Sequence, residues 1–226
     1  MIRVFLIFIA NIALAFAAGT PLDATLARMD QAAAEFKGLS ADLRKVHHTA
    51  VINDDTVDEG TILIKRLKPR DTRMLFDVKQ PDPKTYAFDG HQFEMYLPKA
   101  QTDQVYDVSK YKGLVDQFLL LGFGSSSKDL ATAYTVSYGG PETINGEKAT
   151  RIELVPKSQD LLAHLKRVDL WISDASGVAV QQKLFQPGND YDVATYSNMK
   201  INPNIPDAAL KLNLPKGVKH ENPGKN

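Results

Sequence analysis

The residues that could do chemistry are few, and their spacing fits none of the common catalytic or metal-binding patterns. His47 and His48 are neighbours in a stretch that alternates like a strand, so they point to opposite faces and do not easily share a metal ion. The four carboxylates within residues 54–59 lack the spacing and the glycine of an EF-hand calcium loop. We expect both groups to lie on the surface, the carboxylates in a solvated turn.

A glycine-rich segment and the lack of cysteine narrow the chemistry further. Residues 122–125 read Gly-Phe-Gly-Ser, which is neither the nucleophile elbow of a hydrolase nor a phosphate-binding loop. The 226 residues include no Cys, which excludes a thiol nucleophile, a thiolate zinc site and an iron–sulfur cluster. The sequence therefore predicts no catalytic residue, no metal site and no cofactor, and it indicates a binding protein rather than an enzyme.

The overall composition is that of a folded protein with balanced charge. Lys and Arg number 27, Asp and Glu also number 27, and hydrophobic residues make up 43% of the chain. A disordered chain would carry fewer apolar residues or more net charge, and a dedicated nucleic-acid-binding protein would carry a basic excess. We therefore expect a folded protein without a nucleic-acid partner.

The first residues have the layout of a secretory signal peptide. Arg3 precedes an apolar stretch over residues 4–15, and residues 15–17 read Ala-Phe-Ala, a small-residue cleavage motif. The alternative is a membrane anchor, but the apolar stretch is shorter than the roughly 20 residues that span a bilayer. We predict a cleaved signal peptide over residues 1–17, export to the periplasm, and a single monomeric domain over residues 18–226.

The elements that must position any binding residue are one helix followed by many short strands. Apolar residues recur every three or four positions over residues 22–36, and Gly38 closes this expected helix. Beyond it the period changes to two, with turn signals such as Asn145-Gly146 between strands. The expected strands cover residues 39–44, 60–66, 73–79, 86–88, 93–97, 134–138, 142–156 (a hairpin), 167–172, 178–185, 191–199 and 210–214. This pattern predicts a mainly β, α+β domain whose antiparallel sheet curls or closes, with a loose tail after His220.

The segment over residues 111–123 is more apolar than a half-exposed helix needs, and glycines bound or interrupt it. We expect a short helix there, in a connection between strands. Two interpretations of its apolar residues, and of the large apolar side chains on the sheet, remain open. Either they fill an ordinary core, or the sheet encloses a cavity for an apolar ligand that the segment 114–121 covers.

Several motifs follow one another in the middle of the chain. They are Lys65-Arg66, Met74-Leu75-Phe76, Gln80-Pro81, Asp89-Gly90, Phe93 to Met95 and Tyr96-Leu97-Pro98. In this order and spacing the segment resembles the periplasmic outer-membrane lipoprotein carrier family, LolA. Two departures are that Leu67 stands where the family has Pro, and that Phe76 replaces the family's cavity Trp.

The resemblance implies an open, strongly bent antiparallel half-barrel with a helical lid. Proteins of this family carry lipoproteins through the periplasm by holding their acyl chains, because each CH₂ sheltered from water contributes about 0.8 kcal/mol. The resemblance also implies three kinds of partner: acylated lipoproteins, an inner-membrane ATP-driven lipoprotein-releasing transporter and an outer-membrane lipoprotein acceptor. An envelope sensor or lipid-binding module on the same half-barrel is the alternative.

By position, the resemblance assigns residues to a cavity, a lid and a latch. The cavity residues would be Met74, Phe76, Val78, Tyr86 and Phe93, and the lid residues Phe118, Leu119, Leu120 and Leu121. The family holds its lid shut with an Arg at the end of the second strand, which donates to backbone carbonyls. That position corresponds to Arg66 when counted forward and to Arg70 when counted backward from Gln80-Pro81, and both assignments stay open.

Overall fold

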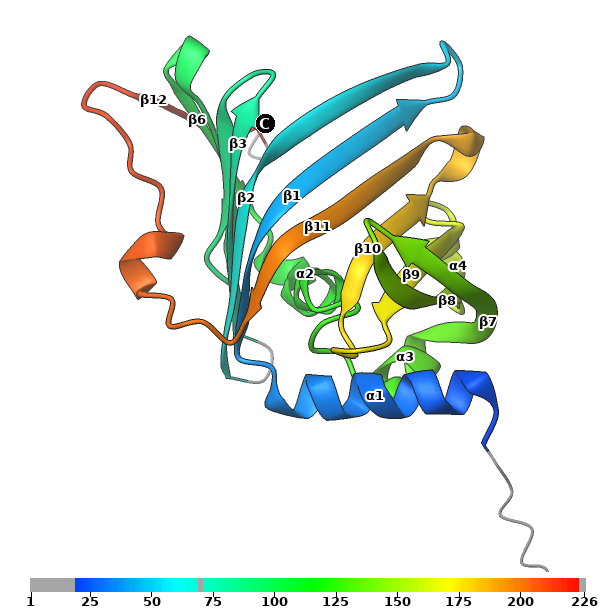
Figure 1. Cartoon of the computed structure of the whole chain (residues 1–226). Coiled ribbons are helices and arrows are strands. Elements are labelled where there is room, and N and C mark those ends of the chain that lie inside the picture. Colours follow the sequence, from blue (N-terminus) through cyan, green and yellow to red (C-terminus); the bar gives the residue numbers. More distant parts are fainter. Residues whose placement is uncertain (1–18, 69–70, 224–226) are drawn as a thin grey trace, which may run out of the picture.

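The computed structural model of this chain describes residues 19–68 and 71–223. The predicted signal peptide and Arg70 lie outside the described residues. Within them, twelve strands form one sheet that bends strongly and does not close on itself, with helices at its base and inside the bend (Figure 1). The predicted fold class, a mainly β open half-barrel with helices, is confirmed.

Helix α1 (Pro21–Glu35) lies where the spacing of apolar residues predicts it. Thr20 Oγ1 accepts a hydrogen bond from the backbone N–H of Asp23 at 3.2 Å, and Asp23 Oδ2 accepts one from the N–H of Thr20 at 2.9 Å. This capping box satisfies two backbone donors that a helix start otherwise leaves unpaired. The buried residues recur at every fourth position: Thr25, Met29 and Ala33.

Shorter helices and the strands account for most of the other described residues. The helices are α2 (Lys112–Leu119), α3 (Ser127–Ala133) and α4 (Gln159–Leu162). The strands of the first half are β1 (Gly38–Thr49), β2 (Asp54–Lys68), β3 (Asp71–Gln80), β4 (Lys84–Phe88), β5 (Gln92–Leu97) and β6 (Thr102–Asp107). Those of the second half are β7 (Tyr134–Ile144), β8 (Glu147–Pro156), β9 (Arg167–Ser173), β10 (Ala179–Phe185), β11 (Tyr191–Ile201) and β12 (Lys219–Glu221).

Two meanders meet in the middle of the sheet. The strand order is β12-β6-β5-β4-β3-β2-β1-β11-β10-β9-β8-β7, so the first meander runs outward from β1 to β6 and the second runs inward from β7 to β11. Each described pair is antiparallel apart from the parallel pairing of β12 with β6. The hairpin of β7 and β8 turns at Asn145 and Gly146, whose φ angles of 49° and 84° suit the predicted Asn-Gly turn.

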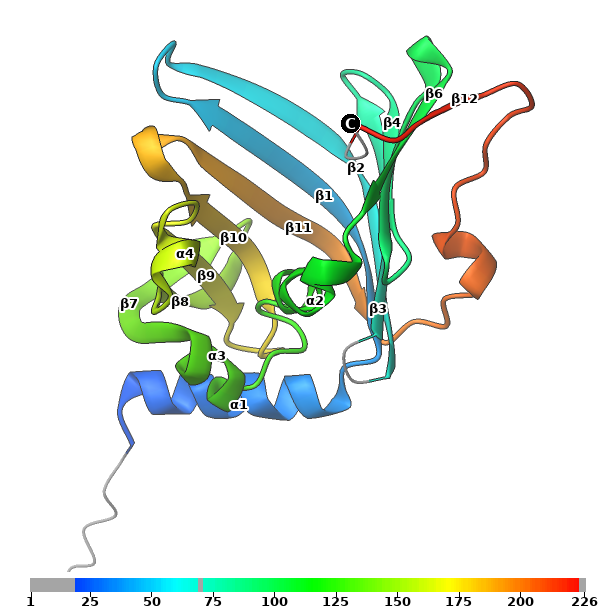
Figure 2. The same ribbon diagram turned by 180° about the vertical axis from the view of Figure 1, so that it is seen from behind.

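The inner face of the bend carries the main core. On β3, the inward residues Met74, Phe76 and Val78 are at most 7% exposed, and they share one apolar cluster with buried residues of α1, β1, β8 and β9. Helix α2 lies inside the bend and contacts β3, while α1 runs across the base of the sheet (Figures 1 and 2). The chain after β11 crosses the outer side of the first meander to reach β12.

One prediction near the C-terminal end is wrong. Residues 210–214 form no strand; a 3-10 helix, η4 (Asp207–Leu210), ends there and buries Leu210. Of the tail expected to be loose after His220, Glu221 belongs to β12, and residues 222 and 223 lie in no strand. Within β12, His220 Nδ1 lies 3.0 Å from Asp103 Oδ2. Strand β12 depends on parallel pairing with β6, a long-range contact that local alternation does not reveal.

The acidic cluster at residues 54–59 lies in a strand rather than in a turn. The turn covers residues 50–53, and the acidic residues extend β2 in continuous register with β1. Asp and Asn are poor strand formers, so their composition indicated a turn, but cross-strand pairing overrides that preference here. Strand β6 and the helices α3 and α4 were not predicted, since their short sequences show too little apolar periodicity.

Candidate functional site: an apolar inner surface under helix α2

An aromatic row crosses the inner face of the first meander. The ring centroids of Phe76 on β3 and Tyr86 on β4 are 6.0 Å apart, and those of Tyr86 and Phe93 on β5 are 5.9 Å apart. Phe76 is buried, whereas Tyr86 and Phe93 are only half-buried. The structure therefore brings three of the predicted cavity residues into contact, and Met74 and Val78 flank Phe76 on the same face of β3.

The predicted lid residues divide between α2 and the turn that follows it. Phe118 and Leu119 end α2 and are half-buried against the core. Leu120 and Leu121 come after the helix and are 9% and 1% exposed. The second pair therefore anchors the segment in the core, and the first pair, with the half-buried Val115, belongs to the helix that lies inside the bend.

The end of this segment is fixed to the second meander by its backbone carbonyls. Gln182 Nε2 donates to the carbonyl of Leu121 at 2.5 Å, and the N–H of Ala179 donates to the carbonyl of Gly122 at 2.7 Å. Tyr196 Oη donates in turn to Gln182 Oε1 at 3.2 Å, and complete burial raises the pKa of Tyr196, which keeps this hydroxyl protonated. The segment is thus attached firmly at its C-terminal end.

Arg66 links the end of α1 to the segment after α2. Its Nη2 donates to the carbonyl of Ala33 at 2.9 Å and to that of Phe36, and its Nη1 donates to the carbonyl of Gly124 at 3.3 Å. The guanidinium also lies 5.6 Å from the ring centroid of Phe36. Burial lowers the pKa of Arg66, but arginine remains charged in proteins. These carbonyl contacts are of the kind that the resemblance assigns to a latch.

The apolar inner surface ends at paired charges toward the turn between β1 and β2. Lys84 Nζ lies 2.9 Å from Asp58 Oδ1, and both side chains are largely buried. Burial alone would lower the pKa of Lys84, but its contacts with Asp58 and Tyr86 raise it. Nearby, Asp192 lies 3.5 Å from Lys45 Nζ and 3.1 Å from His47 Nδ1. Any apolar ligand on the aromatic row would therefore meet a polar boundary at this end.

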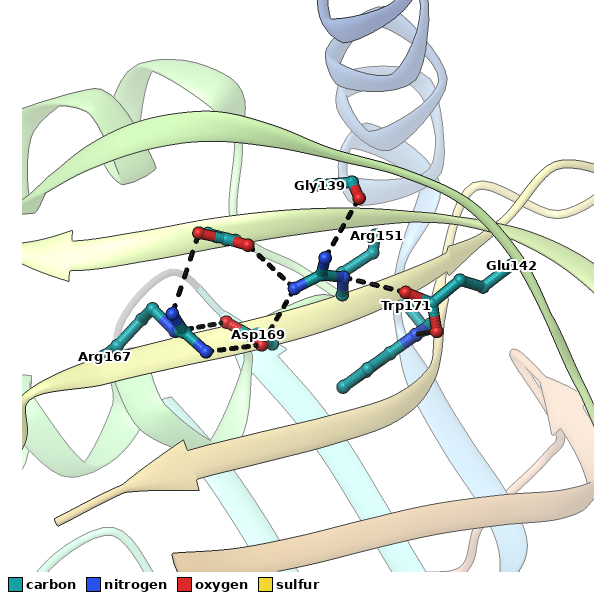
Figure 3. Close-up of polar contacts among 7 residues, drawn as sticks. Gly139, Glu142, Arg151, Arg167, Asp169 and Trp171 are labelled. Atoms are coloured by element: carbon teal, nitrogen blue, oxygen red, sulfur yellow. Dashed lines mark hydrogen bonds and ion pairs between the residues drawn. The ribbon is translucent and has the colours of Figure 1, made fainter. Parts of the chain in front are cut away.

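The outer face of the second meander carries an ion network that spans β7, β8 and β9 (Figure 3). Arg151 Nη1 donates to Glu153 Oε1 at 2.7 Å and to Asp169 Oδ2 at 3.3 Å, and its Nε donates to Glu142 Oε1 at 2.8 Å. The other Glu142 oxygen accepts from Trp171 Nε1 at 2.7 Å, so the Trp lies on the outer face, away from the aromatic row. The network holds β7 onto its neighbours and pairs its cations with carboxylates, which indicates a structural role.

The outer face of the first meander has a groove instead. Its volume is about 480 Å³, and it lies between β2–β5 and the chain leading to β12, with Arg73, Glu94 and Leu214 among its lining residues. Burial raises the pKa of the Glu94 carboxyl, and Asp103 and Asp89 add to this effect.

No helix in the described residues is long and apolar enough to cross a membrane. The same residues hold no cluster of three or more His, Asp or Glu side chains suited to a metal ion.

Sequence reasoning missed several residues that shape the inner site. Met95 pairs with Tyr86 in the sheet and extends the half-buried apolar surface, while Gln182, Tyr196 and Ala179 hold the segment after α2. Gln182 had one available signal: it is a polar residue at an inward position of an expected strand. Its partner, the Leu121 carbonyl, is 61 residues away in the chain, and no local pattern reveals such a contact.

Comparison with known proteins shows a similarity of fold. No family model and no curated protein matches the sequence. Among solved structures, an uncharacterized conserved protein from Thermus thermophilus superposes with a TM-score of 0.53 at 10% identity, covering 90% of this chain and 99% of that one. MucB superposes with a TM-score of 0.52 at 13% identity, covering 84% of this chain and 63% of MucB. A LolA superfamily protein from Nitrosomonas europaea gives a TM-score of 0.41 at 12% identity, covering 84% of this chain and 97% of that one.

The chain therefore shares its overall fold with MucB and with the Thermus thermophilus protein. The similarity covers most of this chain, although the identities are low. The resemblance to the LolA family seen in the sequence agrees with this open half-barrel fold. Such similarity does not by itself identify a ligand, because one fold supports many functions.

Proposed function

We propose that this protein is a periplasmic carrier that holds the acyl chains of lipoproteins between α2 and the inner face of the first meander. The observation that carries the proposal is the aromatic row of Phe76, Tyr86 and Phe93, which is apolar, lies beneath a helix, and is left half-buried on β4 and β5. Apolar side chains that the protein leaves only half-buried on one face favour an apolar ligand.

The geometry of α2 fits a cover that can move at one end. The segment after α2 is held by Gln182, Ala179 and Arg66. Within the helix, Phe118 and Val115 are half-buried, and Lys112 Nζ at its start lies 3.9 Å from Asp71 Oδ1. A ligand could displace the helix and replace its apolar contacts without unfolding the anchor. Arg66 is our candidate for the latch, since its guanidinium joins α1 to Gly124; Arg70 remains the alternative.

The carrier role includes partners at both membranes. An inner-membrane ATP-driven transporter would load the protein, and an outer-membrane acceptor would receive the lipoprotein, so the chain itself would bind and release without catalysis. Signal-peptide cleavage after residue 17 would deliver residues 18–226 to the periplasm as a monomer.

Single cysteines test the site directly, because the chain has no Cys of its own. Met95→Cys would carry an environment-sensitive fluorophore on the inner face, and Val155→Cys, on the outer face and 38% exposed, is the matched control. A triacylated lipopeptide should shift the emission of the label at 95 to the blue and leave the label at 155 unchanged. The same peptide without acyl chains should have no effect. An equal response to both peptides, or none at all, would contradict the proposal.

Shuttling is tested separately by release of a lipoprotein from spheroplasts. Purified protein should move an acylated lipoprotein into the supernatant, and Phe93→Glu should abolish this release because it puts a charge on the aromatic row. Val155→Glu provides the control for an added charge elsewhere on the surface.

An envelope sensor is the second candidate, and MucB is the reason to keep it. MucB has the same half-barrel and has been solved in complex with MucA, and it is the longer protein, since the match covers 63% of it. A sensor would bind a partner protein whether or not that partner is acylated. The two lipopeptides above therefore also separate a sensor from a carrier.

A further inference from the structure

The turn between β1 and β2 presents two large apolar side chains to solvent. Val51 is 90% exposed and Ile52 is 68% exposed, and both are aliphatic residues that a folded protein normally shelters at least in part. The other exposed large apolar residues are isolated: Tyr111, 62% exposed, ends the 3-10 helix η2 (Ser109–Tyr111), and those on strands, such as Val155 and Ile201, are 38–44% exposed. Two adjacent aliphatic side chains at a tip are therefore a distinct feature of this surface.

The hairpin carries this tip beyond the strands on both sides. Pairing of β1 with β11 stops at His48 and Tyr191, and pairing of β2 with β3 starts only at Glu59 and Gln80. The turn residues 50–53 therefore project past the neighbouring strands, as the long hairpin at the upper right of Figure 1 shows. No neighbouring strand of the sheet can cover the tip.

Hydrogen bonds hold the two ends of the turn that carries the tip. Asp190 Oδ1 accepts from the N–H of Ala50 at 2.8 Å, and the N–H of Asn53 donates to the carbonyl of Ala50 at 3.3 Å. At the base of the turn, the His48 ring stacks on Tyr191 with centroids 4.5 Å apart. Val51 and Ile52 are thus exposed on a turn that these contacts order. A contact through a preorganised loop loses little conformational entropy.

We propose that this tip is a membrane contact, at which Val51 and Ile52 insert into the surface of a zwitterionic lipid bilayer. A bilayer accepts a small convex apolar tip without a matching pocket, whereas a stable protein interface buries about 800 Å² on each partner. The flanks of the tip cannot supply such an area of apolar surface, because β2 continues with exposed carboxylates at Asp54 and Asp55.

The same carboxylates determine which lipid surface the tip prefers. Asp54 and Asp55 follow the tip directly, and Asp55 Oδ1 lies 2.7 Å from His48 Nδ1. These negative charges would approach the lipid headgroups together with the tip. Anionic headgroups would repel them, and salt would weaken that repulsion. The tip therefore favours neutral headgroups, and the contact is weak and reversible, with each inserted side chain contributing about tenfold in partitioning.

Flotation with lipid vesicles tests this inference, which does not depend on the proposed acyl cargo. The purified protein should float with phosphatidylcholine vesicles and less with vesicles that contain 30% phosphatidylglycerol. The double variant Val51→Ser with Ile52→Ser should lose tenfold or more of its binding to neutral vesicles. Val155→Ser, an exposed Val on β8, is the matched control and should bind like the wild type. Circular dichroism should show all three proteins folded.

Charge variants give a second, independent readout. Asp54→Asn should increase binding to the anionic vesicles several-fold and change binding to the neutral vesicles little. The inference is overturned if the wild type floats with neither vesicle, or if the double variant floats as well as the wild type. Failure with vesicles combined with loss of lipoprotein transfer in the double variant would assign the tip to a protein partner instead.

Discussion

The two meanders share the alternation of apolar residues along their strands, but they bury their inward side chains to different extents. On β8 and β9 of the second meander, the inward side chains of Ile152, Leu154, Val168 and Leu170 are 0% exposed. On β4 and β5 of the first meander, Tyr86, Phe93 and Met95 are half-buried. The second meander is covered by α1, α3 and the turn after α2, whereas α2 alone lies over the first. The inward faces of β8 and β9 thus belong to a closed core, whereas parts of β4 and β5 keep half-buried apolar surface.

The outer faces of the two meanders differ in how their buried carboxylates are paired with cations. On the second, Asp169 is buried between Arg151 and Arg167, and although burial raises the pKa of its carboxyl, both cations oppose this. On the first, Glu94 has no cation within ion-pair distance among the described residues and lies near the carboxylates Asp103 and Asp89. On the outer faces, Asp169 is thus held between two cations, whereas Glu94 is not.

Truncation of one inward residue on each meander gives the largest expected contrast. Leu154→Ala should lower the free energy of unfolding by about 3–5 kcal/mol, because it opens a cavity in a closed core. Phe93→Ala should lower it by only about 1–2 kcal/mol, since the ring is half-buried. Urea unfolding measures both values. Equal losses would mean that the two meanders are packed alike, and Phe93→Ala should in addition weaken lipopeptide binding.

The glycines around α2 allow a test of the attachment between the meanders. Gly122 has φ +80°, and a Cβ added there would lie 2.6 Å from the Cβ of Ala179, so Gly122→Ala should destabilise the protein by about 2–3 kcal/mol. A Cβ at Gly113, inside α2, would meet open space, so Gly113→Ala should stabilise the helix by up to about 1 kcal/mol. Thermal unfolding distinguishes the two. A harmless Gly122→Ala would show that the turn after α2 is not anchored as described.

Removal of the Arg66 guanidinium should have an intermediate effect. Arg66→Leu leaves the carbonyls of Ala33, Phe36 and Gly124 without their donor, and we expect a loss of about 1–3 kcal/mol. Lys68→Leu is the control, since the Lys68 side chain is 75% exposed. If Arg66 is the latch, the variant should also change lipoprotein loading or transfer. If Arg66→Leu and Arg70→Leu both load and transfer normally, the latch has to be abandoned.

The smallest expected effect concerns Glu94 and depends on pH. Its raised folded-state pKa means that its charge opposes folding once the pH exceeds the ordinary value of 4.5. Glu94→Gln should therefore raise the melting temperature at pH 7 by no more than about 2 °C, and this gain should vanish below about pH 4. Asp89→Asn should have the opposite effect at pH 7, because, against the effect of burial, the backbone N–H groups of His91 and Gln92 lower the pKa of the Asp89 carboxyl and so stabilise its charged form. A Glu94→Gln variant that is less stable at pH 7 would show that the carboxylate has a stabilising role after all.

Local signals in the sequence were sufficient for much of the fold. The apolar spacing over residues 22–36 and Gly38 predicted α1, and period-two alternation between turn signals predicted most strands. The helix, the turns and the strands depend on neighbours within a few residues, so they can be predicted locally. The grouping of Phe76, Tyr86 and Phe93 came from the resemblance to the LolA family, and the structure places the three rings side by side.

Other features could not be predicted from the sequence, because they depend on contacts between residues that are far apart along the chain. Residues 210–214 alternate like a strand but have no strand partner among the described residues, whereas β12 is polar and exists through its pairing with β6. The acidic residues of β2 are held in the sheet by β1. In each case a hydrogen-bonded partner far along the chain decided the outcome against the local preference.

The sequence by itself determined where apolar and polar residues alternate, where the chain turns, and hence that an inner apolar face exists. Only the tertiary structure decided how much of that face is covered. Coverage depends on where α1, α2 and α3 come to lie, and those positions follow from contacts such as Gln182 with Leu121 and Arg66 with Gly124. Burial is a property of the assembled surfaces, so the half-covered aromatic row became visible only in the folded chain.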